Sequence, residues 1–348
     1  MRRIPLVVCL ISVVVIPSAA RTAVADRQVV WTTASERGLE NDINNQALRG
    51  LRVAAVSDGL PCTTTVMQAP EKPGPAVRYR VVADRDLAAM MPSLAQDGFQ
   101  PQFAHRRQFG RAHVIFGRWE GISGAQKWRL IEFKDLDAMP AALTAAAGEG
   151  FRAKILVRYP LKSWPGLSET GLILARQEPA GGAVEPQIVI GQSNKIDATA
   201  KLVADLTAKG YTFDLLFTGS RDGSRDARRE RLVVLLSRAA GGGPASPIAV
   251  KLEKTSSFGT FGSGVPLGVA PFWDDSYVYA WQPAERRQTW ASPIRLSTNE
   301  ATTCLGLDFK LRIDAPHDQA WNIVALVAKK LFNNAYELIY VTDQRIGF

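Results

Sequence analysis

The sequence feature that most constrains the fold is a repeated junction, in which a helical pattern ends in glycine followed by an aromatic residue. Clear copies occur at Gly98-Phe99, Gly150-Phe151 and Gly210-Tyr211. Weaker copies occur at Gly59-Leu60 and Ala335-Tyr336. Strand-like segments with alternating polarity follow the clear copies, which predicts a chain built from repeated supersecondary units.

The second unit shows the pattern best. Residues 77–82 alternate with period two and predict a half-buried strand. Four apolar residues then lie at helical spacing: Leu87, Met90, Met91 and Leu94. Gly98 stands where a helix end favours a left-handed residue, because glycine carries no steric penalty there. Residues 99–106 and 112–119 predict two further strands joined by a polar turn.

The same order of elements is expected in the other units. We predict strands at 29–32, 62–68, 128–133, 151–159, 170–176, 187–190, 211–217, 232–237, 308–313 and 336–341, and helices at about 39–58, 135–149, 196–209 and 318–334. The resulting division is 1–25 signal peptide, 26–70, 71–124, 125–180 and 181–242 for units one to four, 243–306 for an aromatic and Gly-rich insertion, and 307–348 for unit five.

The expected fold class is therefore α+β: about five strand–helix–strand–strand units, with antiparallel sheets and helices packed on one face. The unit resembles a small bacterial domain family of unknown function, whose helix ends in Leu-x-x-x-Gly-aromatic and whose last strand ends in basic residues. The matching residues are Leu94/Gly98/Phe99 with Arg118, and Leu206/Gly210/Tyr211 with Arg238. The third unit departs from it, with Ala146 in the leucine position. The resemblance implies a fold and no activity.

The N-terminus has the three parts of a secretory signal. Arg2 and Arg3 precede an apolar stretch over residues 4–16, and Ala23-Val24-Ala25 is a small-residue cleavage site. A retained anchor is the alternative, but the stretch is shorter than the roughly 20 residues of a membrane-spanning helix. We expect cleavage after Ala25, and a periplasmic or secreted protein without a transmembrane span.

The composition predicts a folded and basic protein. The chain has 348 residues, 46% of them hydrophobic, and a formal charge of +9. A positive surface favours anionic partners. A GC-rich genome that favours Arg codons explains the same composition, and it is the preferred explanation.

Two cysteines remain after cleavage, Cys62 and Cys304. In an oxidising compartment an even pair predicts a disulfide, and two buried thiols are the alternative. No Cys-x-x-Cys motif occurs, and we expect no cofactor and no metal.

Histidines and paired aspartates are the conventional candidates for catalysis. His105 and His113 flank the turn of the second unit and can meet across the hairpin, but no third metal ligand is evident, so exposed hairpin histidines are preferred. Helix capping accounts for His317-Asp318, and a solvated turn accounts for Asp274-Asp275 better than acid–base chemistry does. No nucleophile elbow or phosphate-binding loop is present.

Arginines gather in the predicted hairpin turns. If rotation relates the units, these turns form one basic rim that can bind an anionic envelope polymer through bidentate contacts. Ordinary solvated turns are the preferred alternative, and nucleic acid is not expected in this compartment. The arginines are Arg106, Arg107 and Arg111 in the second unit, and Arg221, Arg225, Arg228, Arg229 and Arg231 in the fourth, with Lys154, Arg158 and Lys162 in the third.

Aromatic residues are densest at Phe272, Trp273, Tyr277, Tyr279, Trp281 and Trp290. Trp and Tyr rings stack on sugars and anchor interfaces, whereas their alternation on a strand also fits plain core packing, which is slightly preferred. The leading functional hypothesis is an exported, non-catalytic binding or interaction protein of the cell envelope, for an anionic polymer or a protein partner. The alternatives are a hydrolase acting on envelope material and a structural envelope component.

Overall fold

The computed structural model describes the greater part of the chain after the N-terminal segment. The described residues are 28–33, 36–57, 63–70, 74–106, 111–121, 126–159, 170–178, 182–192, 195–220, 230–240, 249–255, 259–271, 276–296, 321–330 and 336–345.

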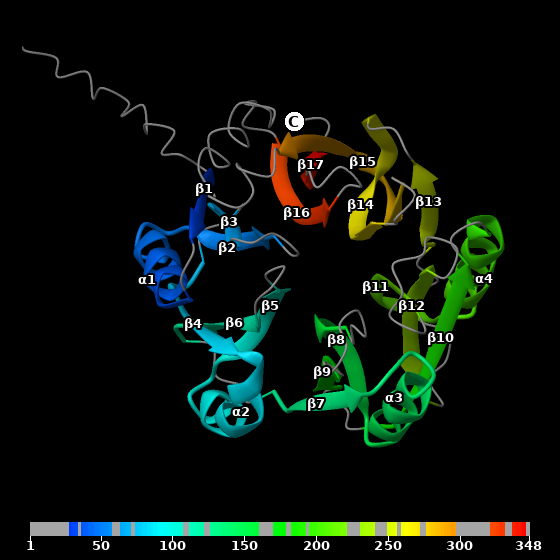
Figure 1. Ribbon diagram of the computed structural model, residues 1–348, viewed down its shortest axis with the longest axis horizontal. Coiled ribbons are helices and arrows are strands. Elements are labelled where there is room, and N and C mark those ends of the chain that lie inside the picture. Colours follow the sequence, from blue (N-terminus) through cyan, green and yellow to red (C-terminus); the bar gives the residue numbers. More distant parts are fainter. Residues whose placement is uncertain are drawn as a thin grey trace, which may run out of the picture.

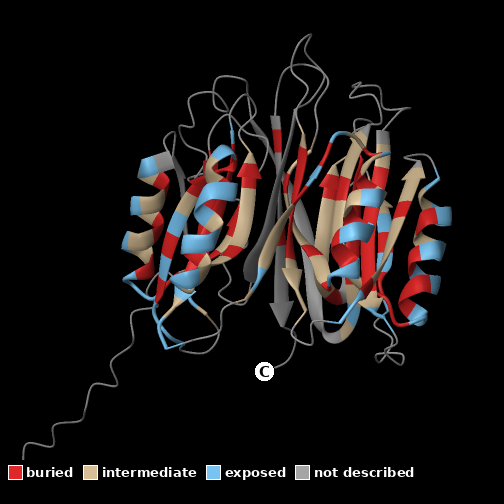
Figure 2. Cartoon of the chain, turned by 90° about the horizontal axis from the view of Figure 1, so that it is seen from below, coloured by how far each residue is buried: buried red, intermediate tan, exposed pale blue. Residues whose placement is uncertain are grey.

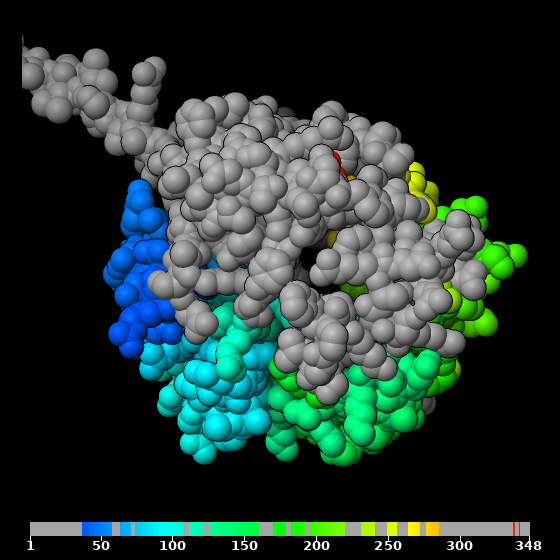
Figure 3. Space-filling view, in the orientation of Figure 1, coloured from blue at the N-terminus to red at the C-terminus, as the bar shows by residue number. Residues whose placement is uncertain are grey.

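Five small antiparallel sheets follow one another around a ring, and four α-helices lie at its circumference, counted over these described residues (Figure 1). The chain is therefore a mixed α+β protein built from repeated sheet units. In space-filling form the first four units follow one another around the outline of the molecule, from blue to green (Figure 3).

Each of the first four units contributes a three-stranded sheet. In every one the third strand in sequence lies at the centre, between the first and the second. The first unit comprises β1 (Gln28–Thr33), α1 (Glu36–Ala47), β2 (Arg52–Val56) and β3 (Thr63–Gln68). The second comprises β4 (Val77–Ala83), the short 3-10 helix η1 (Asp84–Asp86), α2 (Leu87–Gln96), β5 (Gln100–Arg106) and β6 (Ala112–Trp119).

The third and fourth units repeat this order. The third comprises β7 (Trp128–Phe133), α3 (Met139–Gly148), β8 (Phe151–Arg158) and β9 (Gly171–Gln177). The fourth comprises β10 (Val184–Gln192), α4 (Ile196–Ala208), β11 (Thr212–Ser220) and β12 (Glu230–Ala239). These elements agree with the predicted ones to within a few residues at their ends.

The fifth sheet is larger and contains no described helix. Its strands are β13 (Lys251–Thr255), β14 (Gly259–Pro271), β15 (Tyr277–Leu296), β16 (Trp321–Lys330) and β17 (Tyr336–Arg345). The long strand β15 pairs with β13, β14 and β17, so the segment predicted as an insertion supplies three of the five strands. Strand β16 also corrects the helix predicted over 318–334, because its residues pair with β17.

The ring closes through its innermost strands. Strand β2 contacts β5, β5 contacts β8, β8 contacts β11, and β11 contacts β14. Strand β14 contacts β16, and β16 contacts β2. The first and last units are therefore neighbours although they lie at opposite ends of the sequence.

The hydrophobic cores lie at the junctions between units. One core joins Leu39 and Ile43 of α1 to Tyr79 and Ile115 of the second unit. Further cores join α2 to the third unit, α3 to the fourth and α4 to the fifth. The described helices are exposed towards solvent and buried towards the sheets (Figure 2). Each unit thus buries its apolar side chains against the next, as repeats that cannot form a core alone must do.

The predicted glycine junctions are confirmed as left-handed helix ends. Gly98, Gly150 and Gly210 have φ angles of 78°, 82° and 84°. At the second unit the Gly98 N–H donates to the Ala95 carbonyl, and the Phe99 N–H donates to the Leu94 carbonyl, at 3.1 and 2.8 Å. This pair of bonds defines the Schellman motif, which satisfies carbonyls that the last helical turn leaves unpaired.

The first helix ends earlier than predicted. Helix α1 stops at Ala47, and Gly50, with φ 85°, occupies the left-handed position. Residues 52–56, predicted as helix, form strand β2 instead. The junction of the first unit is therefore Gly50-Leu51 and not Gly59-Leu60. Among the described residues, no helix is both long and apolar enough to cross a membrane.

Candidate functional site

The inner and central strands of successive units are joined at one end of the ring, which we call the hairpin face. It carries the strand ends Ser57 and Thr63, Arg106 and Arg111, Tyr159 and Thr170, Ser220 and Glu230, and Pro271 and Ser276. Contacts between neighbouring units place these ends together. Thr63 Oγ1 lies 3.4 Å from His105 Nδ1, and the Thr218 hydroxyl donates to the Pro271 carbonyl at 2.8 Å.

The second and third units meet on this face through an ion pair. The Arg158 guanidinium lies 2.7 Å from the buried Asp84 carboxylate, and its Nε donates to the Thr170 carbonyl at 2.6 Å. The Arg106 guanidinium donates to the Tyr159 carbonyl at 3.5 Å. Arg158 is thus held by a carboxylate, and it contributes less positive charge to the face than its sequence position suggests.

Tyr159 fills the junction between the third and fourth units. Its ring lies against Phe217, with 5.8 Å between centroids, and it occupies the space in which a Cβ on Gly219 would lie. Burial raises the pKa of the Tyr159 phenol, and the charges of Asp135 and Asp137 raise it further. This half-buried phenol, held against Phe217 and Gly219, fits a packing role.

His105 and His113 pair directly across β5 and β6, as predicted, but they are buried and not exposed. Their rings stack with 5.3 Å between centroids. Burial follows because the hairpin face of the second unit packs against the first unit at Thr63. Within the described part of the chain, no group of three or more His, Cys, Asp or Glu residues lies close enough to hold a metal ion.

The inner strands of the third and fourth units hold a compact charged cluster. The Asp214 carboxylate is almost fully buried, accepts hydrogen bonds from Arg152 Nε at 2.6 Å and Ser237 Oγ at 2.5 Å, and lies 3.8 Å from the Lys154 ammonium. Glu178 lies 3.7 Å from Arg152. Because Asp214 belongs to β11 and the two cations belong to β8, the cluster ties one unit to the next.

Burial determines the titration of this cluster. It raises the pKa of Asp214, and Arg152, Ser237 and Lys154 oppose the rise. Burial and the charge of Arg152 lower the pKa of Lys154, outweighing the opposite effect of Asp214. Perturbed pairs of this kind occur at catalytic sites and in structural ion-pair networks. Here two hydrogen-bond donors and a lysine surround the carboxylate, which fits a structural link between units.

The sequence reasoning did not identify this cluster, although a spacing signal exists. In each of the first four units, the residue four positions after the left-handed glycine lies at a β-bulge of the inner strand. The bulge residues are Ala54, Gln102, Lys154 and Asp214. A bulge re-aims a side chain and breaks the strict alternation of a strand. The period-two pattern used to predict strands therefore does not reveal where these side chains point.

The predicted arginine rim is described only in part. Arg111 is exposed and Arg106 is half-buried, both at the hairpin face of the second unit. Arg231 lies at the start of β12, at the same face of the fourth unit. The other predicted members lie outside the described residues: Arg107, Lys162, Arg221, Arg225, Arg228 and Arg229.

Three aromatic residues of β15 lie in the core, and the side chain of Trp290 lies outside the described part. Tyr277, Tyr279 and Trp281 are exposed by 0%, 3% and 9%. The Tyr277 hydroxyl donates to Glu337 at 2.5 Å, and Lys251 lies over the Trp281 ring at 5.1 Å. For these three residues the structure agrees with the prediction of core packing. Phe272, Trp273, Asp274, Asp275, His317, Asp318, Cys62 and Cys304 lie outside the described residues.

At the end of the ring opposite the hairpin face, the aromatic residue of each clear junction meets an arginine. Arg118 lies 5.6 Å from the Phe99 ring centroid, Arg129 lies 5.8 Å from that of Phe151, and Arg238 lies 4.6 Å from that of Tyr211. The basic strand ends in the repeat motif therefore have a packing role. No family model, no curated protein and no solved structure matches this chain.

Proposed function

We propose that the protein is exported and serves as a non-catalytic binding or interaction protein of the bacterial cell envelope. Its binding surface is the hairpin face, and its partner is an anionic polymer or an acidic protein surface. The proposal includes cleavage after Ala25 and a periplasmic or secreted location. It also assigns the repeats to the domain family that they resemble, with every helix on the same face of its own sheet.

One observation carries the proposal. The contacts between neighbouring units gather the strand ends of successive units on a single face. The sequence between those strand ends is rich in arginine in the second and fourth units. A surface assembled from several turns can contact an extended ligand at many points, and arginine pairs bidentately with carboxylates and phosphates.

The described polar groups favour binding over hydrolysis. The two histidines proposed for a hydrolase are buried, and the charged cluster of Asp214 has donors on its carboxylate. A structural envelope component remains the third hypothesis. Recovery of the protein in a fixed-stoichiometry envelope complex, without affinity for polyanions, would favour that third hypothesis.

The test measures binding of dextran sulfate to residues 26–348, with uncharged dextran as the reference polymer. We expect binding that weakens as salt rises, because exposed charges are screened beyond about 10 Å at 0.1 M ionic strength. The double variant Arg107→Ser/Arg111→Ser is expected to bind on the order of fivefold more weakly, since an exposed charge contact contributes up to about 1 kcal/mol.

The matched control is Arg49→Ser/Arg78→Ser. It removes the same charge from two exposed residues, at the end of α1 and the start of β4, opposite the hairpin face. Equal loss of affinity in the two double variants would reject the hairpin face as the binding surface. Separately, N-terminal sequencing of the native protein should begin at Asp26, and an intact Met1 would reject export by cleavage.

A further inference from the structure

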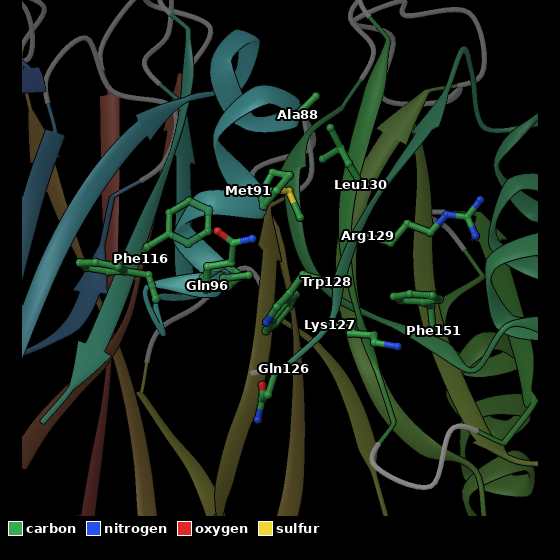
Figure 4. A pocket seen from close by; sticks show the side chains of 14 residues that line it. Ala88, Met91, Gln96, Phe116, Gln126, Lys127, Trp128, Arg129, Leu130 and Phe151 are labelled. Carbon is green, nitrogen blue, oxygen red and sulfur yellow. The ribbon is translucent and has the colours of Figure 1, made fainter. Parts of the chain in front are cut away.

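A pocket of about 570 Å³ lies between α2 of the second unit and β7 of the third (Figure 4). Its walls are mainly apolar, with Met91 and Pro92 from the helix, Phe99 and Phe116 from the second unit, and Trp128 and Phe151 from the third. The volume falls within the range of about 300–1,000 Å³ that is typical of small-molecule sites. The pocket lies towards the helix C-terminus, away from the hairpin face.

The pocket exists because α2 packs less closely on the next unit than the other three described helices do. Helices α1, α3 and α4 pack along the first strand of the following unit, whereas α2 touches β7 much less. Helix α2 contains Pro92, which has no N–H to donate to the Ala88 carbonyl one turn earlier. Ala88 and Pro92 both line the pocket. The small side chains of Ala88 and Ala95 leave open space that larger residues would fill.

Two buried polar atoms, Trp128 Nε1 (a donor) and Gln126 Oε1 (an acceptor), have no hydrogen-bond partner among the described residues. Both residues line the pocket. They are two positions apart on the chain and lie one above the other in Figure 4. A buried donor or acceptor without a partner is destabilising, so such groups indicate an absent ligand or water. A hydroxyl group fits either atom, because it can accept from an indole N–H and can donate to an amide oxygen.

The charge beside these atoms is positive. Lys127 lies between them in sequence, is exposed, and forms no ion pair with any described residue. Arg129, the other cation at the pocket, is held by Glu149 at 2.5 Å. None of the described residues that line the pocket is acidic. Among the described residues, the lysine therefore provides a positive charge at the pocket without an ion-pair partner.

We propose that this pocket binds a hydroxylated fatty acid, with its alkyl chain between α2 and β7. Its hydroxyl group bonds with Trp128 Nε1 and Gln126 Oε1, and its carboxylate faces the Lys127 ammonium. The apolar walls, the donor and acceptor without described partners, and the lysine without an ion pair to a described residue each account for one part of this ligand. The site is separate from the hairpin face, so either proposal can fail alone.

The test is calorimetric titration of delipidated protein with 3-hydroxytetradecanoate and with tetradecanoate, below their micelle-forming concentrations. We expect saturable binding of both acids at one site, with the hydroxylated acid about three- to tenfold tighter. Absence of saturable binding would overturn the proposal. Equal affinity for the two acids would overturn the assignment of the hydroxyl group to Trp128 and Gln126.

Two matched pairs of variants locate the site. Ala88→Trp fills the pocket and is expected to weaken binding at least tenfold, whereas Ala89→Trp, on an exposed neighbour that does not line it, is expected to bind as the parent does. Lys127→Gln is expected to weaken binding several-fold, with Lys134→Gln as its control on an exposed residue outside the pocket.

The variant Trp128→Phe removes the indole donor, and it keeps an aromatic ring of smaller size at the wall. It is expected to abolish the preference for the hydroxylated acid while leaving the affinity for tetradecanoate within twofold. If Ala88→Trp binds like the parent, or if Trp128→Phe keeps the preference, the ligand lies elsewhere and the proposal is wrong. Circular dichroism of each variant verifies that the fold is intact.

Discussion

Lys154 and Asp214 occupy the same position in two consecutive units, and their charged groups lie 3.8 Å apart. Each follows the left-handed glycine of its unit by four residues, and each lies at the β-bulge of its inner strand. The repeat thus places a lysine opposite an aspartate at the junction of the third and fourth units. The corresponding residues of the first two units are Ala54 and Gln102, so the ion pair is specific to one junction.

We predict that Asp214→Asn lowers the free energy of unfolding by about 2–3 kcal/mol. The substitution leaves Arg152 and Lys154 without their buried counter-charge, and breaking such a pair typically costs 3–5 kcal/mol, reduced here because both cations are partly exposed. Urea denaturation at pH 7 measures the change. The control is Glu132→Gln, on an exposed acid, which should stay within about 0.5 kcal/mol of the parent.

A second substitution separates the ion pair from the aspartate's other contacts. Adding Lys154→Met to Asp214→Asn should recover part of the lost stability, because the unpaired ammonium is removed. If the two substitutions are additive, the ion pair contributes nothing, and Asp214 acts through Arg152 and Ser237 alone.

We predict that Gly210→Ala lowers stability by about 1 kcal/mol, because Gly210 has φ 84°, where a side chain is strained. The control is Gly148→Ala at the end of α3. Gly148 has no positive φ, and a Cβ there would meet no atom within 4 Å. Alanine should be neutral or stabilising at that helical position. Thermal denaturation that ranks the two variants equally would contradict the special role of the junction glycines.

Local rules explain what the sequence predicted correctly. The glycine junctions depend on hydrogen bonds within six residues, as at Leu94 to Phe99, so a short motif is sufficient to find them. The strands of the second to fourth units are short runs of alternating or continuous apolar residues, as in the alternating β4 and the buried central strand β6. The first helix was extended too far because residues 54–56 continue an apolar pattern past Gly50.

Long-range pairing explains what the sequence did not predict. The apolar residues from Ile323 to Val327 fit a helical or a strand period, and only their pairing with β17 makes them a strand. Ring closure depends on contact between β2 and β16, far apart in the sequence. The α2–β7 pocket depends on the distance between one helix and the next sheet. Neither the composition nor the periodicity of the sequence predicts that distance.

Tyrosine phenols with raised pKa values lead us to predict that the protein loses stability at alkaline pH. Burial raises the pKa values of Tyr79, Tyr159 and Tyr279 above their ordinary value, about 10. A group whose pKa is higher in the folded protein supports stability below the unfolded pKa, and that support is lost as pH rises above it. We therefore expect the free energy of unfolding to fall as pH rises above about 10, the ordinary phenol pKa.

Urea denaturation at several pH values tests this trend with the variant Tyr79→Phe. The variant should be less stable at pH 8, because it loses the hydrogen bond from the Val53 N–H to the phenol at 3.0 Å. Its stability should then decline less steeply above pH 10 than that of the parent. Parallel pH profiles for the two proteins would show that Tyr79 ionises without cost in the folded state.

The last prediction is a disulfide between Cys62 and Cys304, both outside the described residues. Cys62 immediately precedes β3 of the first unit, and Cys304 follows β15 of the fifth. Those units are neighbours in the ring through β2 and β16, which gives the bond a structural basis. By the chain-entropy model, a bond that closes so long a loop stabilises by roughly 4–5 kcal/mol at most. A thiol assay of the oxidised protein in denaturant should detect no free thiol, and reduction should lower the melting temperature. Two free thiols per chain, or a melting temperature insensitive to reductant, would leave closure of the ring to the contact between β2 and β16 without a covalent link.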